Sequence, residues 1–221
     1  MAELPGFDVR GIQVELNDGY CLVRSDTPLA VIGTAPVGAD HRTARSLLNI
    51  TVPLDFDECM TPEGTVDRVA GAARAPLPRV GMLTAVPMRR VVTVSESDGA
   101  RRVVVFATVG TGHPVRPGEF LWAGREPGTI NLIVLIDANL SPTALAECLT
   151  VTVEAKALTM YESGPATASG APGTGTSTDA VIVASTQRGT FERYAGPVTP
   201  VGFLVGRAVR GAVAAGLLAE R

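Results

Sequence analysis

Hydrophobic and polar positions along the chain predict a first half built of short strands. Apolar side chains alternate over Ile12–Leu16 and Tyr20–Arg24, and the turn residues Asn17-Asp18-Gly19 between them favour a hairpin, so residues 1–24 are assigned to an N-terminal hairpin. Ala30–Gly33 continues as a strand. Asp40 could cap the amide donors of a short helix over Asp40–Leu48, and a second short helix is expected over Thr65–Ala73.

The middle of the chain is rich in β-branched residues and predicts further strands. The best-defined pair is a hairpin around the turn Ser97-Asp98-Gly99. Thr129–Asp137 is apolar on both faces, which is typical of a central strand covered on both sides. The remaining strands are expected over Val80–Thr84, Arg90–Ser95, Arg101–Thr108 and Asp179–Ser185.

Two longer helices are predicted in the second half. Ser141-Pro142 is a helix start, and the helix runs to about Glu162 with an apolar stripe of Leu145, Leu149 and Val153, Thr152 and Met160 lying alongside. Residues 163–178 are rich in glycine and small residues and predict a mobile loop or lid. Gly202–Leu218 is the last helix. We therefore expect one α+β domain over residues 1–221, with a mostly antiparallel or mixed central sheet covered by helices.

Composition excludes several classes of protein. Apolar residues make up 46% of the 221 residues and charged residues 19%, a balance that excludes disorder as the main description. The net charge of −3 and the lack of a basic run argue against nucleic acid as a partner. The most apolar helix is interrupted by Arg207 and Arg210, so no membrane span is expected. With no signal peptide at the start, we expect a cytoplasmic protein.

The sequence contains no strong motif for binding a metal or a nucleotide. Only two histidines are present, His41 and His113, and the three cysteines have no CxxC spacing, so we expect no metal site and no disulfide framework. The run Gly173–Asp179 precedes a strand and contains no lysine, which argues against a phosphate-binding loop, although its backbone amides could form an anion or amide-oxygen site.

Polar residues at the ends of apolar strands are the candidates for chemistry, since sites are commonly built where loops converge. Asn131 lies inside an apolar stretch and must be hydrogen-bonded, either to tie down a loop or to serve a site. His113 either occupies a surface turn or acts in catalysis. Lys156 falls on the apolar side of the long helix, where it either reaches solvent or forms an ion pair or a substrate contact. Asp179 either caps a turn or joins the site.

A series of ordered segments runs from about residue 25 to the C-terminus. The upstream pattern is Leu48-Asn49, Val52-Pro53 and Asp55-Phe56. The others, in chain order, are Met82–Ala85, Ala107–Gly110, His113-Pro114, Gly128–Asn131, Leu140–Pro142, Ala144-Leu145, Val153–Lys156, Gly175–Ala180, Tyr194–Gly196 and Gly206–Val209. In that order, these segments resemble the adenosylcobinamide amidohydrolase family of cobamide salvage. One departure stands before the last helix, where the family tends to have a polar stretch and this chain has Pro197–Phe203.

The resemblance implies hydrolysis of the amide that joins the aminopropanol arm of adenosylcobinamide to the corrin, giving adenosylcobyric acid. It implies a small-molecule substrate, with the corrinoid as substrate and no cofactor. Two alternatives stay open: a non-catalytic protein that binds a corrinoid or another large ligand, and a relative acting on a different amide. A fainter likeness to self-processing aminopeptidases raises chain cleavage as a further alternative. The small-residue last helix could pack within the monomer or against a second copy.

Amide hydrolysis needs a base, a stabiliser of the oxyanion and an acid for the leaving amine. We expect Glu154 or Asp179 as the base and Asn131 with backbone amides near Gly175 as oxyanion donors. Lys156 or His113 would then protonate the amine or orient the carboxylate. Thr108 and Thr178 are the alternative nucleophiles. The expected substrate-binding residues are Asn49, Thr108, Gly110, Thr129, Gly175, Thr176, Thr178 and Tyr194.

Overall fold

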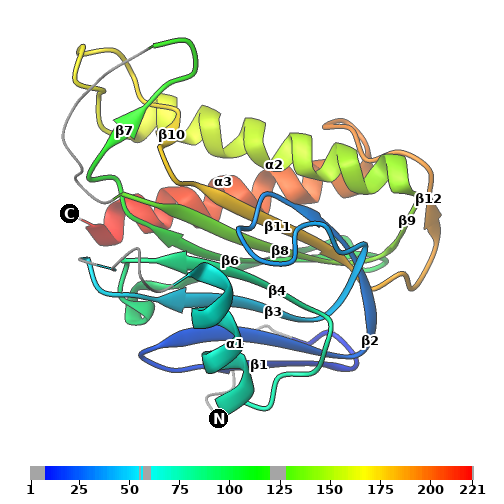
Figure 1. Ribbon diagram of the computed structural model, residues 1–221. Coiled ribbons are helices and arrows are strands. Elements are labelled where there is room, and N and C mark those ends of the chain that lie inside the picture. The colour runs from blue at the N-terminus through cyan, green and yellow to red at the C-terminus, as the bar shows by residue number, and fades with distance from the viewer. Residues whose placement is uncertain (1–7, 55, 57–60, 120–127, 221) are drawn as a thin grey trace.

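Four layers make up the computed structural model, in the order helices, strands, strands, helix (Figure 1). The structure describes residues 8–54, 56, 61–119 and 128–220, so residues 1–7, Asp55 and Cys59 of the sequence predictions lie outside the described residues. The strands and helices of the first part are β1 (Ile12–Leu16), β2 (Tyr20–Gly33), β3 (Thr43–Thr51), α1 (Pro62–Ala72), β4 (Arg79–Thr84), the 3₁₀ turn Met88–Arg90, β5 (Val92–Ser97), β6 (Arg102–Val109) and β7 (Pro114–Val115). The second part contains β8 (Ile130–Asp137), β9 (Asn139–Leu140), α2 (Pro142–Ser163), β10 (Gly175–Thr176), β11 (Ala180–Ser185), β12 (Phe191–Glu192) and α3 (Pro200–Glu220).

The main sheet is mixed and has the order β4-β3-β2-β11-β8-β6-β5, with β1 on β2. Its pairs are antiparallel except for β3 with β4 and β8 with β11. The predicted class, a mixed central sheet covered by helices, is confirmed.

Strand β2 folds this one sheet into two layers. Its register against β3 shifts between Arg24 and Leu29, where Pro28 has no N–H to give to a ladder. Residues before the shift pair with β1 and β3, and residues Ala30–Gly33 pair with β11 in the other layer. The predicted hairpin Ile12–Leu16 with Tyr20–Arg24 is confirmed, and its second strand is part of this longer strand.

Each gap between layers is filled by its own apolar cluster. Alternate residues of β6, β8 and β11, such as Val105 and Leu132, pack against α2 and α3, while Phe106 and Ile133 face the other strand layer. A third cluster lies between β2, β3 and α1. Because β8 is buried on both faces and lies between β11 and β6, the prediction of a covered central strand is confirmed.

The helix predicted over Asp40–Leu48 is wrong, because this segment contributes most of β3. Ala44, Leu47 and Leu48 have the spacing of a helix face. In the structure Leu47 faces the core between the strand layers and Leu48 faces α1, so an apolar residue is needed on both sides of the strand. Burial on both faces hides the alternation that identifies a strand, and pairing with β2 and β4 decides the local structure.

Helix α2 begins as predicted, and Ser141 Oγ accepts a hydrogen bond of 3.0 Å from the Ala144 amide. Its predicted stripe is wrong at Val153, which is 42% exposed. A spacing of four residues rotates by about 40° per step around a helix of 3.6 residues per turn, so Val153 has left the face that Leu145 occupies. The buried face follows the helical period through Cys148, Thr152, Ala155 and Thr159.

Helix α3 matches the predicted last helix and meets the length and composition of a membrane span, with a mean hydropathy of 1.5 over its most apolar window. Of that window, 56% is buried, chiefly against β5, β6 and α2. Thr199 Oγ1 accepts from the Gly202 amide at 3.1 Å and so caps the first turn.

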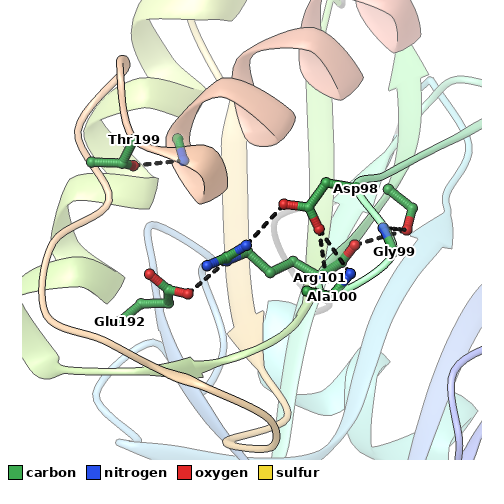
Figure 2. A network of polar contacts seen from close by, with 8 residues as sticks. Asp98, Gly99, Ala100, Arg101, Glu192 and Thr199 are labelled. Atoms are coloured by element: carbon green, nitrogen blue, oxygen red, sulfur yellow. Dashed lines mark hydrogen bonds and ion pairs between the residues drawn. The ribbon is translucent and has the colours of Figure 1, made fainter.

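At the end of the sandwich opposite β7 and β10, an arginine connects the β5–β6 turn to β12 (Figure 2). The Arg101 guanidinium donates to Glu192 Oε1 at 2.6 Å and to Asp98 Oδ2 at 2.9 Å. The hydrogen bond to Glu192, and after it the one to Asp98, raises the pKa of Arg101. Gly99 has a φ of +88° in the turn, which suits glycine. This network has a structural role, because it joins the β5–β6 turn to β12.

Two buried thiols give a testable consequence of the packing. Cys21 and Cys148 are both fully buried, and burial raises the pKa of each thiol to about 12, so neither forms the reactive thiolate near neutral pH. In a Cys59→Ser variant we expect fewer than about 0.1 thiols per folded chain to react with Ellman's reagent at pH 8, and both to react after unfolding in urea. Labelling of the folded variant as fast as free cysteine would contradict the packing.

Candidate active site

Polar side chains close the core between the two strand layers at one end. Asn49, Thr84, Thr108 and Asn131 occupy positions on β3, β4, β6 and β8 that continue the inward-facing rows of apolar residues. All four are buried, with exposed fractions of 0 to 2%. The end of the sandwich that carries β7 and β10 therefore changes from apolar to polar chemistry (Figure 1).

The two asparagines join the strand layers. Asn131 Nδ2 donates to Asn49 Oδ1 at 2.9 Å and to the Leu83 carbonyl at 2.8 Å, while Asn49 Nδ2 donates to Thr108 Oγ1 at 3.0 Å. The prediction that Asn131 must be hydrogen-bonded is confirmed. Its Oδ1 has no partner in the described part of the chain, and a buried acceptor in that state favours an ordered water. We call Asn49, Thr108 and Asn131 the asparagine cluster.

An ion pair connects helix α2, in the neighbouring helix layer, to the turn before β11. Lys156 projects from the inner face of α2 and its ammonium donates to Asp179 Oδ2, each side chain being only 10% exposed. Of the two readings of Lys156, the ion pair is the one observed. Asp179 also accepts from the Thr176 amide at 3.1 Å and from the Thr176 hydroxyl, which supports its predicted capping role.

The geometry gives Asp179 a positioning role. Besides the bonds from Thr176 and Lys156, its Oδ1 accepts from the Ile130 amide at 2.9 Å, so each carboxylate oxygen has two donors. A carboxylate oxygen has two lone pairs in its plane, and all of them are used here. Gly175 lies so close that an added Cβ would be 2.4 Å from Asp179 Oδ2 and 2.7 Å from Lys156 Nζ. The group fixes the start of β8, the turn before β11 and α2 relative to one another.

A pair of hydroxyls lies just outside this ion pair. Thr129 Oγ1 and Thr178 Oγ1 are 2.7 Å apart, and Thr178 Oγ1 donates to the Gly128 carbonyl at 3.0 Å. Thr178 is exposed and Thr129 is half-buried. Gly110 belongs to the same place, because its amide donates to the Thr129 carbonyl at 3.0 Å. We call Gly128, Thr129 and Thr178 the threonine rim.

His113 adjoins the threonine rim from the loop after β6. A Cβ added to Gly128 would be 2.8 Å from the His113 backbone nitrogen, so the two segments touch. His113 immediately precedes β7, whose Pro114 pairs with Thr176 of β10. Its side chain is half-buried and shows no hydrogen bond to the residues that the structure describes. The segment predicted as a lid thus contains the strand β10, which joins the loop of Asp179 to that of His113.

Two predicted site residues lie elsewhere. Glu154 is exposed on the outer face of α2, at a groove between α2 and α3, so the structure does not bring it to Asp179 and Asn131. Tyr194 follows β12 at the opposite end of the sandwich, is 52% exposed and lies under the Arg193 guanidinium. The segment Pro197–Phe203, which departs from the family pattern, lies at the same end of the sandwich as Tyr194. The other predicted residues gather around the asparagine cluster, the ion pair and the threonine rim.

Sequence reasoning missed Thr84 and the Leu83 carbonyl. The signal for Thr84 was present, because it continues the alternation of Val80 and Met82 along β4. The role of the Leu83 carbonyl depends on the fold of the sheet at β2, which no local pattern shows. Within the described residues, no three histidine, cysteine or acidic side chains are grouped as metal ligands.

Comparisons with known proteins agree with the predicted family. The sequence profile described as adenosylcobinamide amidohydrolase matches residues 8–221. The chain belongs to the adenosylcobinamide amidohydrolase family. An adenosylcobinamide amidohydrolase of Halobacterium salinarum is 35% identical over 187 residues, covering 81% of this chain and 76% of the relative. One of Methanosarcina mazei is 29% identical over 173 residues, covering 78% and 76%. The predicted enzyme class, hydrolysis of a C–N amide bond, is confirmed at the level of this adenosylcobinamide amidohydrolase family.

Solved structures show a weaker likeness. The PH0078 protein of Pyrococcus horikoshii is 12% identical with a TM-score of 0.48, covering 99% of this chain and 82% of that one. A β-aminopeptidase of Burkholderia is 12% identical with a TM-score of 0.46, covering 92% and 80%. Neither likeness bears on the chemistry of this member of the amidohydrolase family.

Proposed function

We propose that this chain hydrolyses the amide between the aminopropanol arm of adenosylcobinamide and the corrin, releasing aminopropanol and adenosylcobyric acid. The observation that carries the proposal is the family match over nearly the whole chain, residues 8–221. The names of the two relatives support the same substrate.

The threonine rim is the proposed place of the reaction. Thr178 carries an exposed hydroxyl whose position is fixed by Thr129 and the Gly128 carbonyl. The other candidate nucleophile, Thr108, is fully buried, and the lone pairs of Asp179 are occupied. These contacts favour Thr178 as the nucleophile and leave His113 as the neighbouring group that can take and return a proton.

In the proposed reaction, Thr178 Oγ1 bonds to the carbonyl carbon of the amide and its proton passes to His113. The C–N bond then breaks as His113 returns that proton to the nitrogen, which leaves as the amine. Water adds to the resulting threonyl ester, and cleavage of its C–O bond restores the Thr178 hydroxyl and yields the carboxylic acid. Lys156 and Asp179 act as positioning groups, since they join α2 to the turn that presents Thr178.

The test is incubation of the purified chain with adenosylcobinamide, followed by liquid chromatography and mass spectrometry of the corrinoid and of the amine. We expect adenosylcobyric acid and aminopropanol in equal amounts. Adenosylcobinamide that is bound but unchanged would support the carrier alternative. A substrate that is neither bound nor changed would overturn the proposal, and a second gel band after storage would indicate self-cleavage.

A further inference from the structure

A cavity of about 220 Å³ lies beside the threonine rim and has no part in the reaction described so far. It opens where the C-terminal ends of α2 and α3 meet the loop that follows β6. Its lining residues are Thr111, Ser163, Gly164, Pro165, Leu217 and Glu220.

The charge that the described residues bring to this cavity is negative. Among them, Glu220 is the one ionisable side chain in the lining, and no cation pairs with its carboxylate. The C-terminal end of a helix carries a partial negative charge, and both α2 and α3 end here. A carboxylate and two helix C-termini together favour a cation.

The Glu220 carboxylate is held in place and can still accept further hydrogen bonds. Glu220 Oε1 accepts from the Thr111 amide at 2.8 Å, and Oε2 accepts from the Thr111 hydroxyl at 2.6 Å. Each oxygen thus has one donor and a second lone pair that a ligand can use. Leu217 and Pro165 supply apolar wall beside it. The lining suits a short ammonium compound that carries a methyl group and a hydroxyl.

The cavity is close to the place of the proposed reaction. Thr111 follows Gly110, whose amide is bonded to the Thr129 carbonyl of the threonine rim, and it lies two residues before His113. We propose that this cavity binds the amino-alcohol half of the substrate, an inference that depends on the proposed function. Glu220 accepts from the hydroxyl of the arm before cleavage and from the ammonium group of the product after it.

Calorimetric titration with 1-amino-2-propanol at pH 7.5, where the amine is protonated, tests the inference without any turnover. We expect a dissociation constant of about 1–10 mM for the unaltered chain, typical of so small a ligand. Glu220→Gln should weaken binding about tenfold or more, because a hydrogen bond to a charged group is lost. Glu96→Gln, at a half-buried carboxylate of β5 outside the cavity lining, is the matched control and should bind as the unaltered chain does.

Two further measurements keep the test decisive. Ser163→Phe should obstruct the exposed side of the cavity while Glu220 stays charged, so it should also weaken binding if Glu220→Gln fails to fold. Neutral 1,2-propanediol should bind at least tenfold more weakly than the amine. No binding of the amine at 50 mM, or equal binding by Glu220→Gln, would overturn the inference even if adenosylcobinamide is hydrolysed. Amine binding without hydrolysis would instead leave this cavity in place and remove the proposed function.

Discussion

Replacing Thr178 with alanine should lower kcat/KM for adenosylcobinamide by about 1,000-fold or more, since the proposed reaction loses its nucleophile. Thr178→Ser keeps the hydroxyl and should retain activity within about tenfold. The measurement is the initial rate of aminopropanol release by each purified variant. Ser177→Ala is the matched control, because Ser177 is exposed, adjacent and without a hydrogen bond to the described residues.

The same variants can refute the assignment. Thr178→Ala with more than a tenth of the original kcat/KM would show that water attacks directly or that another hydroxyl is the nucleophile. A comparable loss in Ser177→Ala would place the effect in the turn as a whole, and the role of Thr178 would have to be abandoned.

The largest expected effect on stability comes from the ion pair. Lys156→Met removes the cation beside Asp179, where both side chains are 10% exposed, and leaves a carboxylate charge with little access to water. We expect the free energy of unfolding to fall by about 3 kcal/mol, as is usual when one partner of a buried pair is removed. The measurement is urea unfolding followed by circular dichroism.

A matched surface pair gives the scale for this effect. Arg207 and Glu96 are 3.2 Å apart with side chains 57% and 25% exposed, so Arg207→Met should cost less than about 1 kcal/mol. The double variant Lys156→Met with Asp179→Asn should be destabilised by less than the sum of the two single changes. Additive losses, or a loss below 1 kcal/mol in Lys156→Met, would contradict the coupling of this pair.

Several features of fold and site could be predicted because their causes are local. The apolar run of β8 identifies a covered strand, Ser141-Pro142 identifies the start of α2, and the turn at Asp98-Gly99 identifies a hairpin. In these three cases the residue type and its neighbours in sequence contain the physical reason. For Lys156, on the apolar side of the helix, the sequence left open whether the side chain reaches solvent or meets a partner, and the structure shows the ion pair with Asp179.

What could not be predicted depends on contacts between distant segments. Asn49 directly follows the segment Asp40–Leu48 that predicts a helix, yet it lies on β3 and bonds to Thr108 and Asn131 across the two strand layers. That contact exists only because β2 bends after Arg24 and carries one sheet onto itself. Glu154 is a different case. Its residue type suited a base, but its position on α2 places it on the exposed outer surface.

Hydrolysis in water enriched in oxygen-18 tests the central claim most directly. The proposal predicts that adenosylcobinamide is converted to adenosylcobyric acid with heavy oxygen in the new carboxyl group, together with unlabelled aminopropanol, as read by mass spectrometry. Recovery of unchanged adenosylcobinamide from folded protein saturated with this substrate would contradict the proposal. A corrinoid product without the label would contradict it as well.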